Sequence, residues 1–404
     1  MLGQRPRAYA KAVLNPVLAY IEFSRLPAAA KRAVRDDAAG PSAFDPGPMA
    51  AIEAALGWLA RAQDCSRSRD GGVARDYSLL TGWASSYPET TGYIVPTILQ
   101  QAARRHDPAL RERGRRMLDW LVSIQHPEGG FSGGIVDQGS VLPVTFNTGQ
   151  ILLGLAAGTA VFGDKYRTAM RQAADWLSGT LDSDGCWRRY RTPFASQDDK
   201  TYETHVSWGL FEAARVDGNT HWAEAGLRQV RWALTKQRPN GWLESCCLEN
   251  PSRPLTHTLG YALRGIVECW RFSRDAEFLA AARRLADGLA TAQRPDGRLP
   301  GKLKSDWSAA VPWVCLTGTA QIAHSWLILY GETGEQRYRA AGFAANAFVR
   351  RTLAYVGSDE IRGGVKGSFP IDGDYGRFQY LNWAAKFLID SNQAEDDIHT
   401  AAGL

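Results

Sequence analysis

The chain has 404 residues, of which 45% are hydrophobic, 22% charged and 10% aromatic, which is typical of a globular protein and excludes a disordered one. The net charge of +5 is mild, and basic residues form no long blocks with interleaved aromatics, so nucleic-acid binding is not indicated. No run of about 18 uncharged apolar residues occurs, so no transmembrane helix is expected. The six cysteines have no zinc-ligand spacing, and no calcium, phosphate or dinucleotide motif occurs, so we expect neither a metal nor a cofactor.

Residues 1–48 are predicted to form an N-terminal helical arm and a linker. Charges and Pro16 interrupt every apolar run of the first forty residues, so no signal peptide is predicted and a cytoplasmic location is favoured. The segment Ala8 to Ile21 is amphipathic and has basic residues on both sides. Residues 1–35 are therefore compatible with peripheral contact to an anionic membrane, or with an arm that packs on the main body.

One pattern then repeats along the chain: an amphipathic helix that ends in a turn with glycine and an aromatic residue. Five copies place Trp58, Trp120, Trp176, Trp232 and Leu289 at spacings of 62, 56, 56 and 57, and a degenerate sixth copy ends near Phe348. A second helix, apolar almost all round, follows each turn. These second helices begin near Thr90, Asn147, Glu203, Thr256, Thr317 and Leu381.

A helix that is apolar all round is buried, so we expect the second helices inside and the tryptophan-bearing helices outside. Six such hairpins bury a common core when they are stacked in a closed ring. The pattern therefore predicts an all-α fold, an (α/α)6 toroid over residues 49–392 with a tail at 393–404. An open solenoid of hairpins is the alternative.

In such a ring the inner helices run parallel, so their N-termini and the long loops before them meet at one end. A pocket there is the default ligand site. The loops combine aromatic faces, on which pyranoses stack, with carboxylates, arginines and amides that bind hydroxyls. The residues expected to bind substrate are Arg75, Tyr77, Tyr87, Asn147, Arg188, Tyr202, Trp208, Trp242, Glu244, Lys302, Trp313, Lys366, Asp372, Tyr380 and Asn382.

Two pairs of ionisable residues occupy equivalent places in different repeats. His205 and His257 fall in the first turns of adjacent inner helices, which suits an acid/base pair, although a capping role is the structural alternative. Glu89 and Glu203 lie just before inner helices, where the helix dipole favours the ionised acid. That predicts a lowered pKa and a nucleophile, base or hydroxyl clamp, or else support of the N-cap. The string 202–205 is the strongest single candidate for the site.

The hairpin count and the turn resemble two groups of helical toroids. One contains carbohydrate enzymes: unsaturated glucuronyl hydrolases, acylglucosamine 2-epimerases, polysaccharide lyases and glucuronyl C5-epimerases. The other contains terpene cyclases and prenyltransferases, whose QxxxGxW/F turn is echoed at 125–131, 237–242 and 293–299. The isoprenoid resemblance lacks a DxDD acid, a DDxxD helix and a zinc set. The strings at 71–97 and 363–390 are similar to toroid proteins of bacterial exopolysaccharide clusters.

The resemblance implies glycan chemistry, and three mechanisms stay open. A hydrolase needs two carboxyls, whereas a lyase or C5-epimerase needs a base, an acid such as Tyr261 and a cation that holds the uronate. A 2-epimerase uses paired histidines. We expect an enzyme that cleaves a glycosidic bond in a bacterial surface polysaccharide intermediate with an acidic sugar, lipid-linked forms included. An epimerase, a non-catalytic glycan-binding protein and a terpene cyclase-like enzyme are the alternatives.

Overall fold

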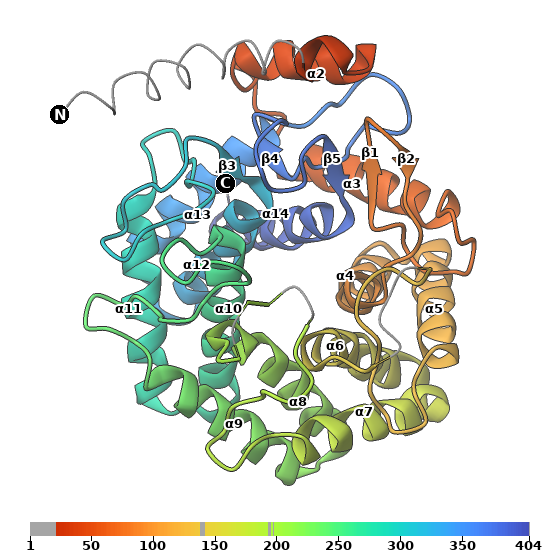
Figure 1. The fold of residues 1–404 in the computed structure, drawn as a ribbon, viewed down its shortest axis with the longest axis vertical. Helices are drawn as coiled ribbons and strands as arrows, with labels where there is room; N and C mark the ends of the chain where they lie inside the picture. Colours follow the sequence, from red (N-terminus) through yellow and green to blue (C-terminus); the bar gives the residue numbers. More distant parts are fainter. Residues whose placement is uncertain (1–21, 138–141, 193–194, 197, 404) are drawn as a thin grey trace, which may run out of the picture.

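The computed structural model describes residues 22–137, 142–192, 195–196 and 198–403, and twelve of its α-helices form two concentric rings (Figure 1). The inner ring consists of α4 (Pro88–Arg105), α6 (Thr145–Phe162), α8 (Thr204–Asp217), α10 (Thr256–Ser273), α12 (Leu316–Thr333) and α14 (Asn382–Ala402). The outer ring consists of α3 (Pro48–Asp64), α5 (Pro108–Ser123), α7 (Arg167–Gly179), α9 (Thr220–Leu234), α11 (Ala276–Ala292) and α13 (Gln336–Arg350). The predicted (α/α)6 toroid is confirmed.

Each inner helix from α4 to α12 packs on the outer helix that follows it, across a short connection. The last inner helix, α14, has no following outer helix and packs instead on α3, the first outer helix, and on α4. These contacts close the ring and exclude the open solenoid. The residues predicted to form a tail at 393–404 belong mostly to α14, which continues to Ala402.

Small residues let the inner helices approach each other closely. A Cβ atom at Gly92 of α4 would lie 2.4 Å from the Cα of Ile151 on α6, well inside van der Waals contact. On the next interface, a Cβ at Gly149 would lie 2.5 Å from Val206 of α8. The glycines in the inner helices therefore set the narrow diameter of the ring.

The repeated turn couples neighbouring hairpins. Nε2 of Gln125 donates to the carbonyl of Gly129 in its own turn, at 2.8 Å, and to the carbonyl of Ala169 on the next outer helix, at 2.9 Å. Equivalent pairs of bonds come from Gln63, Gln237 and Gln293. The glutamine of the motif thus has a structural role, which explains its recurrence without assigning it to a chemistry.

Short strands fasten the long loops together where the ring closes. The strands β1 (Asp76–Ser78), β2 (Gly82–Trp83) and β5 (Gln379–Leu381) form an antiparallel sheet in the order β2-β1-β5, with Tyr77 opposite both Trp83 and Tyr380. The strands β3 (Val314–Cys315) and β4 (Ser368–Phe369) form a second antiparallel pair. The first loop is thereby paired to the last one in the chain.

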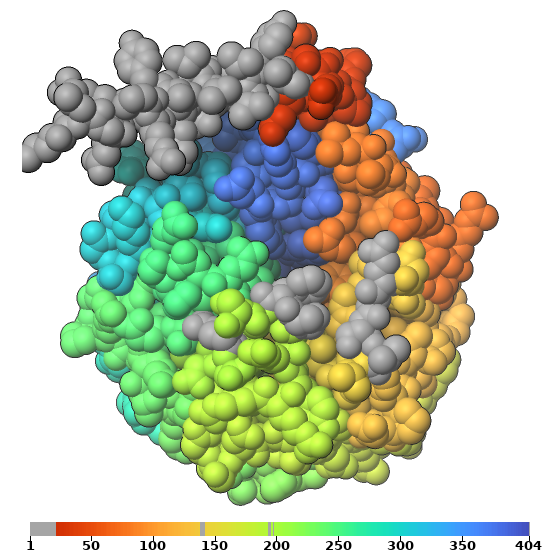
Figure 2. Space-filling model, viewed as in Figure 1, coloured from red at the N-terminus to blue at the C-terminus, as the bar shows by residue number. Residues whose placement is uncertain are grey.

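The described part of the arm packs on the toroid through α2 (Ala28–Ala38), which lies at the edge of the molecule beside the last loop (Figure 2). The buried carboxylate of Asp37 accepts hydrogen bonds from Nζ of Lys366 and from the backbone N–H of Ile371. Asp45 follows with a bidentate ion pair to Arg350 at 2.7 Å. The amphipathic segment from Ala8 to Ile21, and with it the predicted membrane contact, lies outside the described residues. None of the described helices combines the length and the apolar character needed to cross a bilayer.

Candidate functional site

A cavity of about 450 Å³ lies at the end of the ring where the inner helices begin. Its walls come from the first turns of α4, α6, α10 and α14, and from the long loops that precede inner helices. The predicted convergence of helix N-termini therefore does produce a pocket. Seven of the residues predicted for the site line it: Arg75, Tyr87, Glu89, Asn147, Tyr202, His257 and Tyr261.

Glu89 is a buried carboxyl in the first turn of α4, on the wall of this cavity. The hydroxyl of Tyr87 donates to its Oε2 at 2.7 Å. Burial raises the pKa of Glu89 to about 7, against the opposing effects of the Tyr87 hydrogen bond and the Arg75 guanidinium. The expectation of a lowered pKa from the helix dipole is wrong, because desolvation outweighs that dipole. Near neutral pH this carboxyl is about half protonated and able both to give and to take a proton.

His257 is the second residue of α10, and its position there is equivalent to that of Glu89 on α4. Burial lowers its pKa to about 3, so the imidazole is neutral at pH 7. The amide of Gln321 on α12 satisfies its neighbours only when its nitrogen donates to Nδ1 of His257, at 2.9 Å. Because Nδ1 is then an acceptor, the imidazole proton lies on Nε2.

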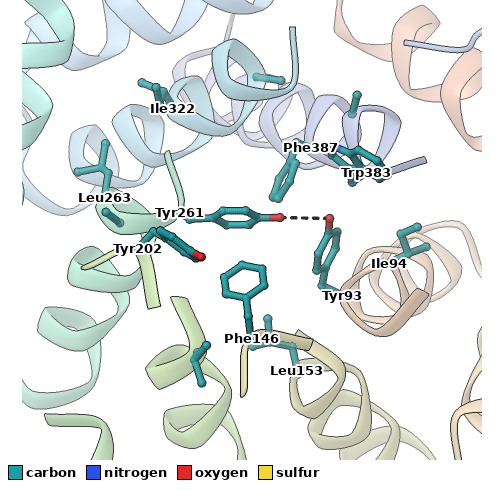
Figure 3. Packing of buried hydrophobic residues seen from close by; sticks show 14 of the residues in the cluster. Tyr93, Ile94, Phe146, Leu153, Tyr202, Tyr261, Leu263, Ile322, Trp383 and Phe387 are labelled. Carbon is teal, nitrogen blue, oxygen red and sulfur yellow. Dashed lines mark hydrogen bonds between the residues drawn. The ribbon is translucent and has the colours of Figure 1, made fainter. Parts of the chain in front are cut away.

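Tyrosines form the floor of the cavity (Figure 3). The hydroxyls of Tyr93 on α4 and Tyr261 on α10 meet across the middle of the ring at 3.4 Å, and the Phe146 ring lies 5.0 Å from that of Tyr261. Since α4 and α10 are three positions apart in a ring of six, this contact spans the lumen. Burial keeps the pKa of both tyrosines well above 10, so both hydroxyls stay protonated. The hydroxyl of Tyr202, also on the wall, has no hydrogen-bond partner among the described residues.

His205 and Glu203 are buried behind the cavity wall. Nδ1 of His205 lies 2.7 Å from Oε1 of Gln150, and the His205 ring packs 4.6 Å from that of Tyr261. Burial lowers the pKa of His205 well below 6.5. The predicted histidine pair is therefore split: His257 lines the cavity, whereas His205 lies in a second layer behind Tyr261.

Glu203 has a buried cation beside it that the sequence interpretation missed. Nζ of Lys200 lies 3.4 Å from Oε1 of Glu203, and both side chains are almost fully buried. Lys200 also donates to the backbone carbonyls of Trp187 and Asp198. Burial raises the pKa of Glu203 to about 7, as it does for Glu89. The predicted equivalence of the two glutamates is wrong in position, because Glu89 is the second residue of α4 whereas Glu203 precedes α8, whose second residue is His205. Glu203 does not line the cavity.

The other predicted binding residues do not line the cavity. Three of them form ion pairs: Arg188 with Asp182, Asp184 and Asp199, Glu244 with Arg238, and Lys366 with Asp37. Three are packing tryptophans: Trp208 under Arg264, Trp242 against Trp307, and Trp313 over Gly301. The rest lie in loop pairings or on the surface: Tyr77, Tyr380, Asn382, Lys302 and Asp372.

Tyr93, Phe146 and Trp383 are among the lining residues that were not predicted. Tyr93 had a signal in the sequence, because it follows Gly92 and stands four residues after Glu89, as Tyr261 follows Gly260 and stands four residues after His257. Opposed helices with the same register bring these tyrosines together. Among the described residues no three His, Cys, Asp or Glu side chains are grouped to hold a metal ion.

The geometry defines the class of fold, which is the (α/α)6 toroid. No protein-family model and no curated protein matches the sequence. Among solved structures, a heparin-specific unsaturated glucuronyl hydrolase has a TM-score of 0.69 at 15% identity, over 87% of this chain and 97% of that one. The unsaturated glucuronyl hydrolase of Bacillus sp. GL1 gives 0.66 at 16%, over 88% and 97%. Cellobiose 2-epimerase from Bacillus thermoamylovorans gives 0.65 at 10%, over 84% and 96%.

Proposed function

We propose that the protein is a carbohydrate-processing enzyme that binds a sugar in this cavity and uses Glu89 as its proton-transferring group. The observation that carries the proposal is the carboxyl of Glu89, which is buried on the cavity wall with a pKa near 7. A general acid is most effective when its pKa lies near the working pH. The solved structures that share the fold are sugar hydrolases and epimerases, which supports a sugar as the substrate class.

Cleavage of a glycosidic bond is the reaction we favour. In its protonated form Glu89 would donate its proton to the leaving oxygen and, once ionised, would take a proton from the attacking water. Nε2–H of the neutral His257 would donate a hydrogen bond to the sugar. Arg75 stands at the same wall, with its guanidinium 5.5 Å from the centre of the Trp383 ring. That pair would hold the carboxylate of an acidic sugar on the cation and its ring on the indole.

Epimerisation is the second candidate, and the placement of Glu89 and His257 favours it. The two groups come from helices on opposite sides of the ring, so they would address opposite faces of one sugar carbon. In such an arrangement the ionised carboxyl of Glu89 would remove a proton from one face, and Nε2–H of His257 would be the donor at the other. The bacterial surface polysaccharide, lipid-linked or free, remains a prediction about the substrate.

Mass spectrometry of acidic and neutral oligosaccharides, incubated with the protein in deuterated water, tests the proposal. A gain of water indicates a hydrolase, an unsaturated end indicates a lyase, and deuterium uptake without cleavage indicates an epimerase. Glu89→Gln and His257→Gln should each lower the rate about 100-fold or more. Glu244→Gln is the matched control, since Glu244 pairs with Arg238 outside the cavity and should leave the rate unchanged.

Loss of activity in the control, or full activity in Glu89→Gln, would contradict the assignment of Glu89. Sugar binding without any reaction across the panel would instead favour a glycan-binding protein.

A further inference from the structure

A second cavity, of about 300 Å³, lies on the other side of the tyrosine contact. Tyr93 lines both cavities, and the remaining walls of the second one come from the middle and the C-terminal halves of the inner helices. The Tyr93–Tyr261 contact therefore divides the lumen into two chambers. We call this second cavity the rear cavity; the proposed reaction does not use it.

Three cations line the rear cavity: Arg264, Arg271 and Lys386. The guanidinium of Arg264 lies 4.2 Å from the centre of the Trp208 ring, which holds it flat against the wall. Nζ of Lys386, whose side chain is 3% exposed, is bonded to Asp390 at 2.6 Å. Burial and the charge of Arg264 lower the pKa of Lys386, whereas Asp390 raises it, so the two cations repel each other across this space.

The acceptors near these cations are already occupied. Asp390 accepts from Lys386 through one oxygen and from Thr97 through the other, at 2.7 Å. Two carboxylates outside the lining also accept: Glu268 from Arg264 at 2.8 Å and from Arg271 at 3.1 Å, and Glu332 from Arg271 at 3.2 Å. The carboxylates of the network therefore present little unused negative charge to the cavity.

Donors, in contrast, remain available. Nη1 of Arg264 donates to Nδ1 of His324 at 2.9 Å, which leaves the imidazole proton on Nε2. Burial and the three cations lower the pKa of His324 well below 6.5, so this histidine is neutral. Its Nδ1 is the acceptor and its Nε2 carries the proton. Among the described residues, Nε2 of His324 and Nη2 of Arg264 have no hydrogen-bond partner, and Lys386 bonds only to Asp390. The wall is thus rich in N–H donors and in positive charge.

The rear cavity is accessible from solvent, because two of its lining residues, Gln100 and Arg271, are exposed at its rim. Its volume is at the lower end of the range for ligand sites, about 300–1,000 Å³, and suits a small solute. We propose that the rear cavity binds a small oxyanion, phosphate or a compact organic phosphate, through Arg264, Arg271, His324 and Lys386. Charge-assisted bonds from guanidinium and ammonium groups are the strongest that such an anion forms in proteins.

Isothermal titration calorimetry of the full chain in chloride buffer tests this site, with inorganic phosphate and glycerol 3-phosphate as separate probes. Arg271→Gln and His324→Gln should each weaken binding about tenfold or more, since each removes a donor to a charged ligand. Arg274→Gln is the matched control, because Arg274 pairs with Glu332 as Arg271 does but does not line the rear cavity. Thermal unfolding of each variant checks that the fold is retained.

Binding of inorganic phosphate that the two variants lose and the control keeps would support a free-anion site. Binding of glycerol 3-phosphate alone, with the same dependence on Arg271 and His324, would support a site for organic phosphates. Failure of both probes to bind, or equal binding by all variants, would overturn the proposal.

Discussion

Replacing Glu89 with glutamine should make the protein more stable at alkaline pH while it removes the proposed catalytic group. The folded state raises the pKa of this carboxyl from 4.5 to about 7, so folding opposes its ionisation. Between these two values the folded state binds more protons than the unfolded state, and the free energy of unfolding falls as pH rises through this window. At about 1.36 kcal/mol per pH unit, the ionisation of Glu89 lowers the free energy of unfolding by about 3 kcal/mol at pH 8.

At pH 5 the same penalty is below about 1 kcal/mol, because the folded carboxyl is still protonated. The difference in unfolding free energy between Glu89→Gln and the native protein should therefore grow by about 2 kcal/mol in favour of the variant from pH 5 to pH 8. Any lost contact to Tyr87 adds a constant offset that does not depend on pH. Urea unfolding followed by circular dichroism at both pH values measures the change.

Glu244→Gln serves as the control, since its carboxylate lies outside the cavity in an ion pair with Arg238. Its difference from the native protein should not grow in favour of the variant at alkaline pH. A Glu89→Gln difference that stays constant from pH 5 to pH 8 would refute a buried carboxyl of raised pKa, and with it the main support for the proposed function.

Two further predictions concern the ring and the arm. Gly92→Ala should lower the unfolding free energy by about 1–3 kcal/mol or more, because its Cβ would lie 2.4 Å from Ile151, whereas Gly179→Ala, with no atom within 4 Å, should change stability by less than about 1 kcal/mol. Equal effects in urea unfolding would contradict the close helix approach. Lys366→Met should cost about 3–5 kcal/mol, since it leaves Asp37 buried without its cation. Lys366→Met/Asp37→Asn should recover much of that loss, and a double variant no more stable than the single one would show that the pair does not hold the arm.

The fold could be predicted from the sequence because its periodicity is long and regular. Repeated tryptophans and all-apolar second helices are local signals, and a ring is the arrangement that buries six of them at once. The position of the site followed from the same logic, which placed Glu89, Asn147 and His257 correctly on the cavity wall. These residues lie in the first turns of inner helices, where the fold alone determines which end they face.

Loop residues were predicted less well, because their partners lie far away in the chain. Lys366 was predicted to bind an acidic substrate because it is a cation in a long loop. Its partner is Asp37, 329 residues earlier, and no local pattern in the sequence links the two. The pKa of Glu89 was predicted with the wrong sign for a related reason. A helix dipole can be inferred from sequence position, whereas desolvation depends on every side chain that surrounds the carboxyl.

The contact of α14 with α3 gives the ring a seam. Every other outer helix packs on the inner helix that precedes it in the chain, whereas α3 packs on α14, which is synthesised last of the twelve. During translation the ring therefore stays an open arc whose first helix exposes the face that α14 will cover. Closure of the ring therefore depends on a contact between its first outer helix and its last inner helix, which are separated by more than 300 residues.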